Sequence, residues 1–187
     1  MPTSRRSVLA AAGAGLASLG SAGATTASAQ AHAGSLSSKE TSKQVAELIQ
    51  RSADANAALM RGDIDGYRAL ITLTDDFTLM SPFGGTPTRG ADMTSESWKA
   101  MGRFFRNGTL EQELVHAYGS TDMVVLAIIE RARVEVGGLP AQDWPLRVTL
   151  VFRREGAEWR LAHRHADPLV AGINLERAAA LARGEAS

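Results

Sequence analysis

The sequence predicts one α+β domain in which three helices precede an antiparallel sheet. Apolar residues recur at helical spacing over much of residues 45–105, whereas strand-like alternation dominates residues 110–165. Glycine-containing turns of hairpin length separate the alternating segments. Because helices come first and strands follow, the order favours an antiparallel sheet over a repeated βαβ unit.

The start of the chain has the pattern of an export signal. Arg5-Arg6 is followed by a weakly apolar stretch rich in alanine and glycine, and no acidic residue occurs before Glu40. The stretch ends in a small-x-small cleavage site at Ala27-Ser28-Ala29. It resembles a twin-arginine signal peptide and is too diluted by glycine and serine to act as a membrane anchor. We expect a signal over 1–29, a linker over 30–40, and a periplasmic or secreted bacterial protein without membrane contact after cleavage.

The predicted domain covers residues 41–170. A first helix is expected to end at Gly62, and Asp63 is placed to cap a short second helix. A third helix is expected over about 92–105. A short strand is predicted at 77–80, longer strands at 110–118, 123–136, 146–154 and 159–165, and a tail or short helix at 171–187.

Two stretches resemble one known superfamily. The first is TDDFTLMSPFG at 74–84, with Arg89-Gly90 after it, and it resembles the front half of the nuclear transport factor 2-like superfamily. That group includes SnoaL-like cyclases and ketosteroid isomerases. The second is VFRREGAEWRLAHRH at 151–165, which is similar to the association domain of calcium/calmodulin-dependent kinase II and its bacterial relatives. The resemblance implies a cone-shaped fold in which a curved sheet wraps around the helices and leaves an apolar pocket for a small hydrophobic molecule.

The resemblance also argues against ketosteroid isomerase chemistry. The isomerases' general base, proton-sharing aspartate and tyrosine would fall on Ser81, Arg147 and Ala55. None of these side chains can perform those roles. Two functions therefore stay open: an exported small-molecule-binding protein with isomerase-, cyclase- or hydratase-like activity, or a non-catalytic binding or oligomerisation module.

Three histidines are the candidate catalytic residues. Strict alternation places His163 and His165 on the same strand face as Trp159 and Leu161, and His116 lies on another strand. A histidine that faced the pocket would serve as general acid or base. No metal site is predicted, since a histidine pair at a strand end needs a third ligand and an inward face.

Five other residues are candidates for ligand binding. Arg147 and Thr149 share a strand face that the resemblance directs toward the pocket, where the arginine would meet Glu130 or an acidic ligand. Tyr67 and Trp98 lie on helices expected to line the pocket, and Ser81 lies at the exit of the first strand. The predicted partner is thus a small hydrophobic or acidic molecule.

The strand face opposite Arg147 and Thr149 predicts self-association. Val148, Leu150 and Phe152 would expose a continuous apolar strip, which favours a homodimer or a higher homo-oligomer.

Composition excludes several chemistries. The 187 residues contain no cysteine, which removes thiol nucleophiles, thiolate zinc sites and iron–sulfur clusters. The 20 basic and 20 acidic residues balance, so no nucleic-acid partner is expected. The motifs of serine hydrolases, phosphate-binding loops and zinc metalloproteases are absent, and no cofactor is predicted.

Overall fold

The computed structural model describes residues 38–185. The predicted signal peptide and most of the predicted linker lie outside the described residues. The elements are α1 (Ser38–Met60), α2 (Ile64–Leu70), β1 (Leu73–Met80), β2 (Thr88–Arg89), η1 (Gly90–Asp92), α3 (Ser95–Phe104), β3 (Phe105–Gly119), β4 (Met123–Val136), β5 (Leu139–Glu155), β6 (Glu158–Pro168) and α4 (Leu175–Ala182). None of these helices is long and apolar enough to cross a membrane.

The strands form one curved sheet in the order β2-β1-β6-β5-β4-β3, which confirms the α+β prediction. Consecutive hairpins join β3 to β6, so these pairs are antiparallel. The pair β1–β6 differs from the predicted antiparallel pattern, because it is parallel. A parallel pair requires a long crossover, and the chain between β1 and β6 supplies it.

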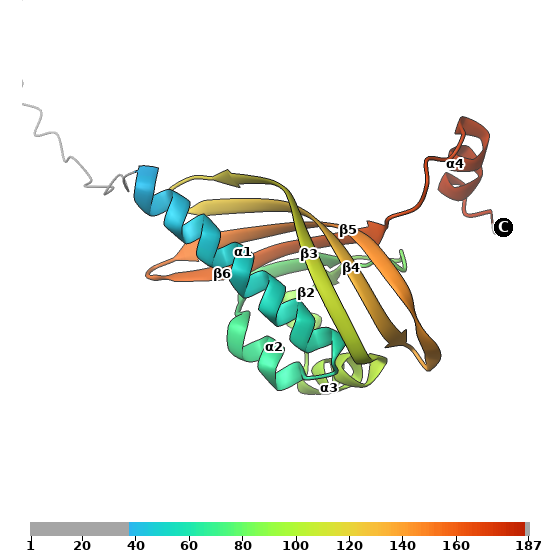
Figure 1. Cartoon of the computed structure of the whole chain (residues 1–187), viewed down its shortest axis with the longest axis horizontal. Coiled ribbons are helices and arrows are strands. Elements are labelled where there is room, and N and C mark those ends of the chain that lie inside the picture. The colour runs from blue at the N-terminus through green and yellow to red at the C-terminus, as the bar shows by residue number, and fades with distance from the viewer. Residues whose placement is uncertain (1–37, 186–187) are drawn as a thin grey trace, which may run out of the picture. The chain divides into compact units, whose positions relative to one another are not determined.

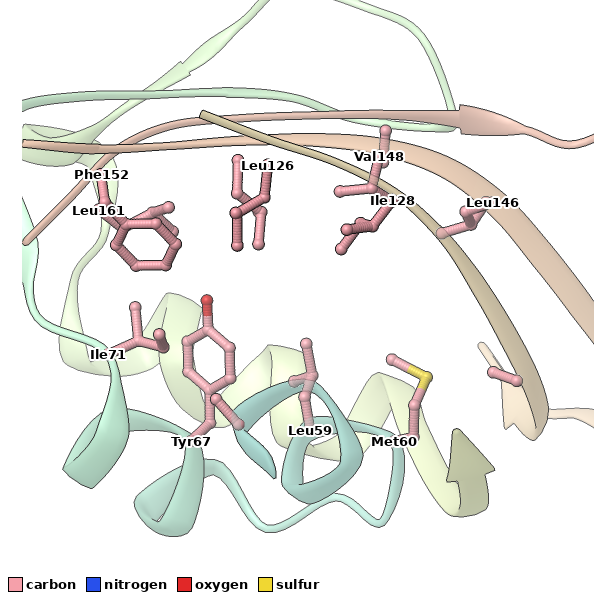
Figure 2. Packing of buried hydrophobic residues seen from close by; sticks show 14 of the residues in the cluster. Leu59, Met60, Tyr67, Ile71, Leu126, Ile128, Leu146, Val148, Phe152 and Leu161 are labelled. Carbon is pink, nitrogen blue, oxygen red and sulfur yellow. The ribbon is translucent and has the colours of Figure 1, made fainter. Parts of the chain in front are cut away.

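The three N-terminal helices cover one face of the sheet (Figure 1). Inward-pointing residues of the central strands are buried, for example Leu126 on β4 and Phe152 on β5, each with 0% exposure. They face Leu59 of α1 and Ile71 after α2 across the core (Figure 2). The sheet therefore has a buried inner face against the helices and a more open outer face.

Several strands are longer than predicted. β5 begins at Leu139 and not at residue 146, although it contains Pro140 and Pro145. Only β4 pairs with this first part, because β6 joins β5 from Leu146 onward. The prolines thus lie where one side of the strand needs no ladder hydrogen bond. Likewise, β1 starts at Leu73, upstream of the predicted 77–80.

The segment at Asn107-Gly108 lies within β3, in an irregularity of its pairing with β4. Asn107 has a positive φ of 54°. A Cβ at Gly108 would lie 2.7 Å from the carbonyl oxygen of Met60 and from Val134 Cγ2. Glycine therefore lets the end of α1 pack directly on β3.

Candidate functional site

A cavity of about 460 Å³ lies between the helices and the sheet. Its volume is in the range of small-molecule sites. Hydroxyl or guanidinium groups come only from Tyr67, Ser81, Ser97 and Arg164 among the lining residues of the described chain. Most of the wall is apolar, with Met60, Phe77, Leu79, Met93, Met101 and Phe104 among its residues.

Among the described residues, one side chain of the lining is charged, and it is ion-paired. Arg164 donates from Nη2 to Oε2 of Glu130 at 2.7 Å and from Nη1 to Oε1 at 3.0 Å. Asn56 Nδ2 also donates to Oε1 of Glu130 at 2.8 Å. The side chains of Arg164 and Glu130 are only 13% and 2% exposed. Burial opposes the charge of Arg164, but Glu130 outweighs it, so the pKa of the guanidinium lies above its ordinary value.

Tyr67 supplies a hydroxyl next to this pair. Its side chain is buried, and the hydroxyl points from α2 toward the sheet (Figure 2). Burial raises the pKa of Tyr67, and the charge of Arg164 opposes that rise only in part. The phenol is therefore protonated at neutral pH and is able to donate a hydrogen bond.

Trp98 packs beside Tyr67, with ring centroids 5.9 Å apart. Two helix caps hold these rings in place: Asp63 Oδ1 accepts from the backbone N of Gly66 at 2.8 Å, and Thr94 Oγ1 accepts from that of Ser97 at 3.2 Å. The Asp63 cap is the predicted one.

A tight turn brings α2 against α3. Gly62 has φ of 81°, and a Cβ there would lie 2.9 Å from the carbonyl oxygens of Gly102 and Phe105. Only glycine combines this backbone conformation with so close an approach.

The structure separates the eight predicted site residues into two groups. Tyr67, Trp98 and Ser81 line the cavity. Their role in ligand binding stays a prediction. The other five, His116, Arg147, Thr149, His163 and His165, lie on the outer face of the sheet.

Cross-strand pairing shows this placement. His116 pairs with Ala127, Ala127 with Thr149, and Thr149 with His165. Directly opposite residues share a face of a sheet, so these side chains form one row across it. Met80 on β1 continues the row beyond His165.

The predicted inward orientation of Arg147 is wrong. Its side chain is 61% exposed, and Nε donates to Oδ1 of Asp167 at 2.6 Å. Thr149 shares its face, whereas Val148, Leu150 and Phe152 point into the core with at most 3% exposure. The predicted alternation is correct, but the face assigned to the core was the opposite one. The apolar strip expected to drive self-association is therefore buried.

The predicted face of His163 and His165 is wrong for a different reason. Val151 pairs with His163 and Phe152 with Leu161, so the register shifts at Ala162. This bulge turns Leu161 inward and both histidines outward. Nδ1 of His163 lies 2.7 Å from Oγ1 of Thr78. Burial lowers the pKa of His163, and the charge of nearby His165 lowers it further.

The third histidine, His116, is exposed and packs against Tyr118 with ring centroids 4.5 Å apart and the rings tilted by 58°. None of the three histidines lines the cavity.

Sequence reasoning named Glu130 but gave it Arg147 as its partner, and it missed Arg164, which the structure pairs with Glu130. Glu130 had a usable signal, since it interrupts the buried alternation of β4 between Ile128 and Ala132. An acidic residue at such a position requires a buried partner. Arg164 had no comparable signal, because the bulge reverses the alternation just before it.

The curved sheet, the helices packed on its inner face and the mostly apolar cavity between them make up the nuclear transport factor 2-like fold. Residues 48–171 match the model of the SnoaL-like domain, so the chain belongs to the SnoaL-like family. The sequence matches none of the curated proteins.

Solved structures agree with this fold. A protein from Thiobacillus denitrificans, described as a calcium/calmodulin-dependent protein kinase type II association domain, has a TM-score of 0.52 at 24% identity and covers 64% of this chain and 93% of its own. A nuclear transport factor 2-like protein from Salmonella enterica has a TM-score of 0.58 at 17% identity, with 72% and 98% covered. A protein from Streptomyces avermitilis, described as a dehydratase, has a TM-score of 0.58 at 20% identity, with 70% and 99% covered.

Proposed function

We propose that this protein binds a small apolar molecule in the cavity and does not transform it by acid–base chemistry. The observation that carries the proposal is the lining: within the described chain it is apolar except for three hydroxyl side chains, the indole N–H of Trp98 and Arg164. A general base needs a titratable group that faces the ligand and has no structural partner. No carboxylate or imidazole lines the cavity among residues 38–185. Glu130 lies behind Arg164, and both its oxygens already accept hydrogen bonds.

The proposal keeps the expected export, which would place the binding protein in the periplasm or outside the cell. A lining without a carboxylate or an imidazole among the described residues disfavours the isomerase-, cyclase- or hydratase-like alternative.

Cavity occupation tests the binding proposal. Met101 lines the cavity, whereas Lys99 lies two residues away on α3 and its side chain is 66% exposed. We expect Met101→Trp to weaken binding of ethylnaphthalene by roughly tenfold or more, because the larger side chain fills space that the ligand needs. Lys99→Trp is the matched control and should bind like the parent protein. Equilibrium dialysis measures both, with circular dichroism as the check of folding. Equal affinity in the two variants would contradict the proposal.

We also propose self-association through the outer face of the sheet. The surface in question, here called the outer patch, consists of Met80, Tyr118, Val125, Ala127, Ile129, Thr149 and Val151. Cross-strand pairs join Tyr118 to Val125, Val125 to Val151 and Ala127 to Thr149, whereas His165 lies between Thr149 and Met80. Met80 and Tyr118 are 44% and 61% exposed. Ion pairs flank the patch, such as Arg131–Glu113 and Arg153–Asp76. An apolar centre with a charged rim is the usual composition of a protein interface.

A second copy of this chain is the proposed occupant, in keeping with the likeness to association domains. Val151→Glu should convert the oligomer into a monomer, since it puts a charge in the centre of the patch. Val170→Glu is the control, because Val170 is 65% exposed outside the patch. Light scattering at micromolar concentration measures the mass, and a monomeric parent protein would contradict this proposal.

A further inference from the structure

The charge balance inside the cavity restricts the kind of molecule that fits there. Arg164 is the only charged side chain in the lining of the described chain, and Glu130 neutralises it across two hydrogen bonds. The cavity therefore contains a strong hydrogen-bond donor without an uncompensated positive charge. These two properties have different consequences for a neutral ligand and for an anionic one.

The donors remain available to a ligand. A guanidinium has five N–H groups. The hydrogen bonds among residues 38–185 engage only one on Nη1 and one on Nη2 of Arg164, both directed at Glu130. Tyr67 lines the same cavity and lies close enough to Arg164 for each to influence the pKa of the other. An acceptor atom that enters from the apolar side thus meets two kinds of donor.

A carboxylate ligand is disfavoured by the same arrangement. Glu130 already holds one negative charge at the guanidinium, and its side chain is 2% exposed. A second carboxylate would lose its hydration in an apolar cavity and would lie near a like charge. A ketone, ester or amide carbonyl accepts the same hydrogen bonds without either cost.

Resting on the binding function proposed above, we propose that the ligand is an uncharged apolar molecule with one carbonyl-type acceptor, which Arg164 and Tyr67 hydrogen-bond. The expectation of an acidic ligand at an arginine is thereby replaced. The arginine that reaches the cavity is already paired, and its partner selects against acids.

Three probes with one ring system separate the possibilities: the ketone acetylnaphthalene, the carboxylate of naphthoic acid, and the hydrocarbon ethylnaphthalene, all substituted at the same ring position. Equilibrium dialysis of the intact protein at pH 7 measures their affinities. We expect the ketone to bind about tenfold or more tightly than the hydrocarbon and than the carboxylate. A carboxylate that binds as well as the ketone, or a ketone that binds no better than the hydrocarbon, would overturn the inference.

Substitution of the pair sharpens the test. Glu130→Gln keeps the shape and an acceptor for Asn56 but leaves the charge of Arg164 uncompensated. The preference should then invert in favour of naphthoate by about tenfold. Arg164→Met should lower the affinity for the ketone and narrow its advantage over the hydrocarbon to what Tyr67 alone supplies, whereas Arg147→Met on the outer face is the matched control. An unchanged preference in a folded Glu130→Gln variant would count against the inference.

The proposed binding function and the inference about the ligand class would fail in different ways. If none of the probes binds, ethylnaphthalene included, the binding function itself fails. If the hydrocarbon binds in the cavity, as its loss in Met101→Trp would indicate, but the order among the three probes is not the expected one, only the inference about ligand class fails. This distinction needs only the parent protein and the Met101→Trp variant, so it does not depend on the folding of the Glu130 and Arg164 variants.

Discussion

Removal of Arg164 is expected to destabilise the fold strongly, because it leaves Glu130 buried without its cation. The carboxylate is 2% exposed, and Arg164 makes bonds of 2.7 and 3.0 Å to it. Breaking a buried pair from one side costs about 3–5 kcal/mol. For a domain of this size, that corresponds to a decrease in Tm of roughly 6–20 °C. By contrast, Arg147→Met breaks an exposed pair with Asp167 and should cost about 1 kcal/mol or less.

Urea denaturation followed by circular dichroism measures the free energy of unfolding of both arginine-to-methionine variants. The double variant Arg164→Met/Glu130→Gln removes both charges, keeps an acceptor for Asn56 and should recover much of the lost stability. The reasoning is refuted if Arg164→Met costs no more than Arg147→Met, or if the double variant is less stable than Arg164→Met alone. Either result would mean that water reaches Glu130 and that the pair is not a buried one.

Three further predictions concern other parts of the chain. Replacing Arg5 and Arg6 by lysine should leave unprocessed precursor in the cytoplasm, and fractionation that finds a normal mature form starting near Gln30 would refute the twin-arginine interpretation. Gly108→Ala should lower the free energy of unfolding by about 1–3 kcal/mol, because its Cβ would lie 2.7 Å from Met60 O; Gly172→Ala, with open space around it, is the control, and equal urea midpoints would contradict the close approach. The pKa of His163 is lowered from 6.5, so the unfolded chain binds a proton at this ring more readily than the folded protein does, and stability is lost as pH falls from about 7 through the folded pKa. His163→Gln should flatten this pH dependence of the unfolding free energy in urea titrations at several pH values. If His163→Gln shows a pH dependence as steep as that of the control His116→Gln, His163 is not its source.

The errors about the site have identifiable physical origins. The alternation of β5 was predicted correctly, but alternation has two faces and carries no information on which one meets the helices. Arg147 was assigned to the pocket on the wrong face, although its pair with Asp167 lies on the outer one. In β6 the alternation itself fails, since the bulge at Ala162 changes the phase between Leu161 and His163.

Local patterns were enough for the type and order of the elements in the described domain. Helical spacing, the cap at Asp63 and the strand runs act over a few residues, and the structure has three helices before the long strands. The inference that Tyr67, Trp98 and Ser81 lie near the pocket came from the resemblance, and the structure places all three in the cavity lining.

Contacts between distant segments settled the rest. The ion pair of Glu130 and Arg164 joins residues 34 positions apart, and Asn56 adds a third group 74 positions from Glu130. Such a pair depends on the curvature of the sheet, on the bulge in β6 and on the way α1 crosses the inner face, none of which is encoded within a short window. The compensated charge of the cavity is therefore a property of the packed domain, because it arises only where three separate elements meet.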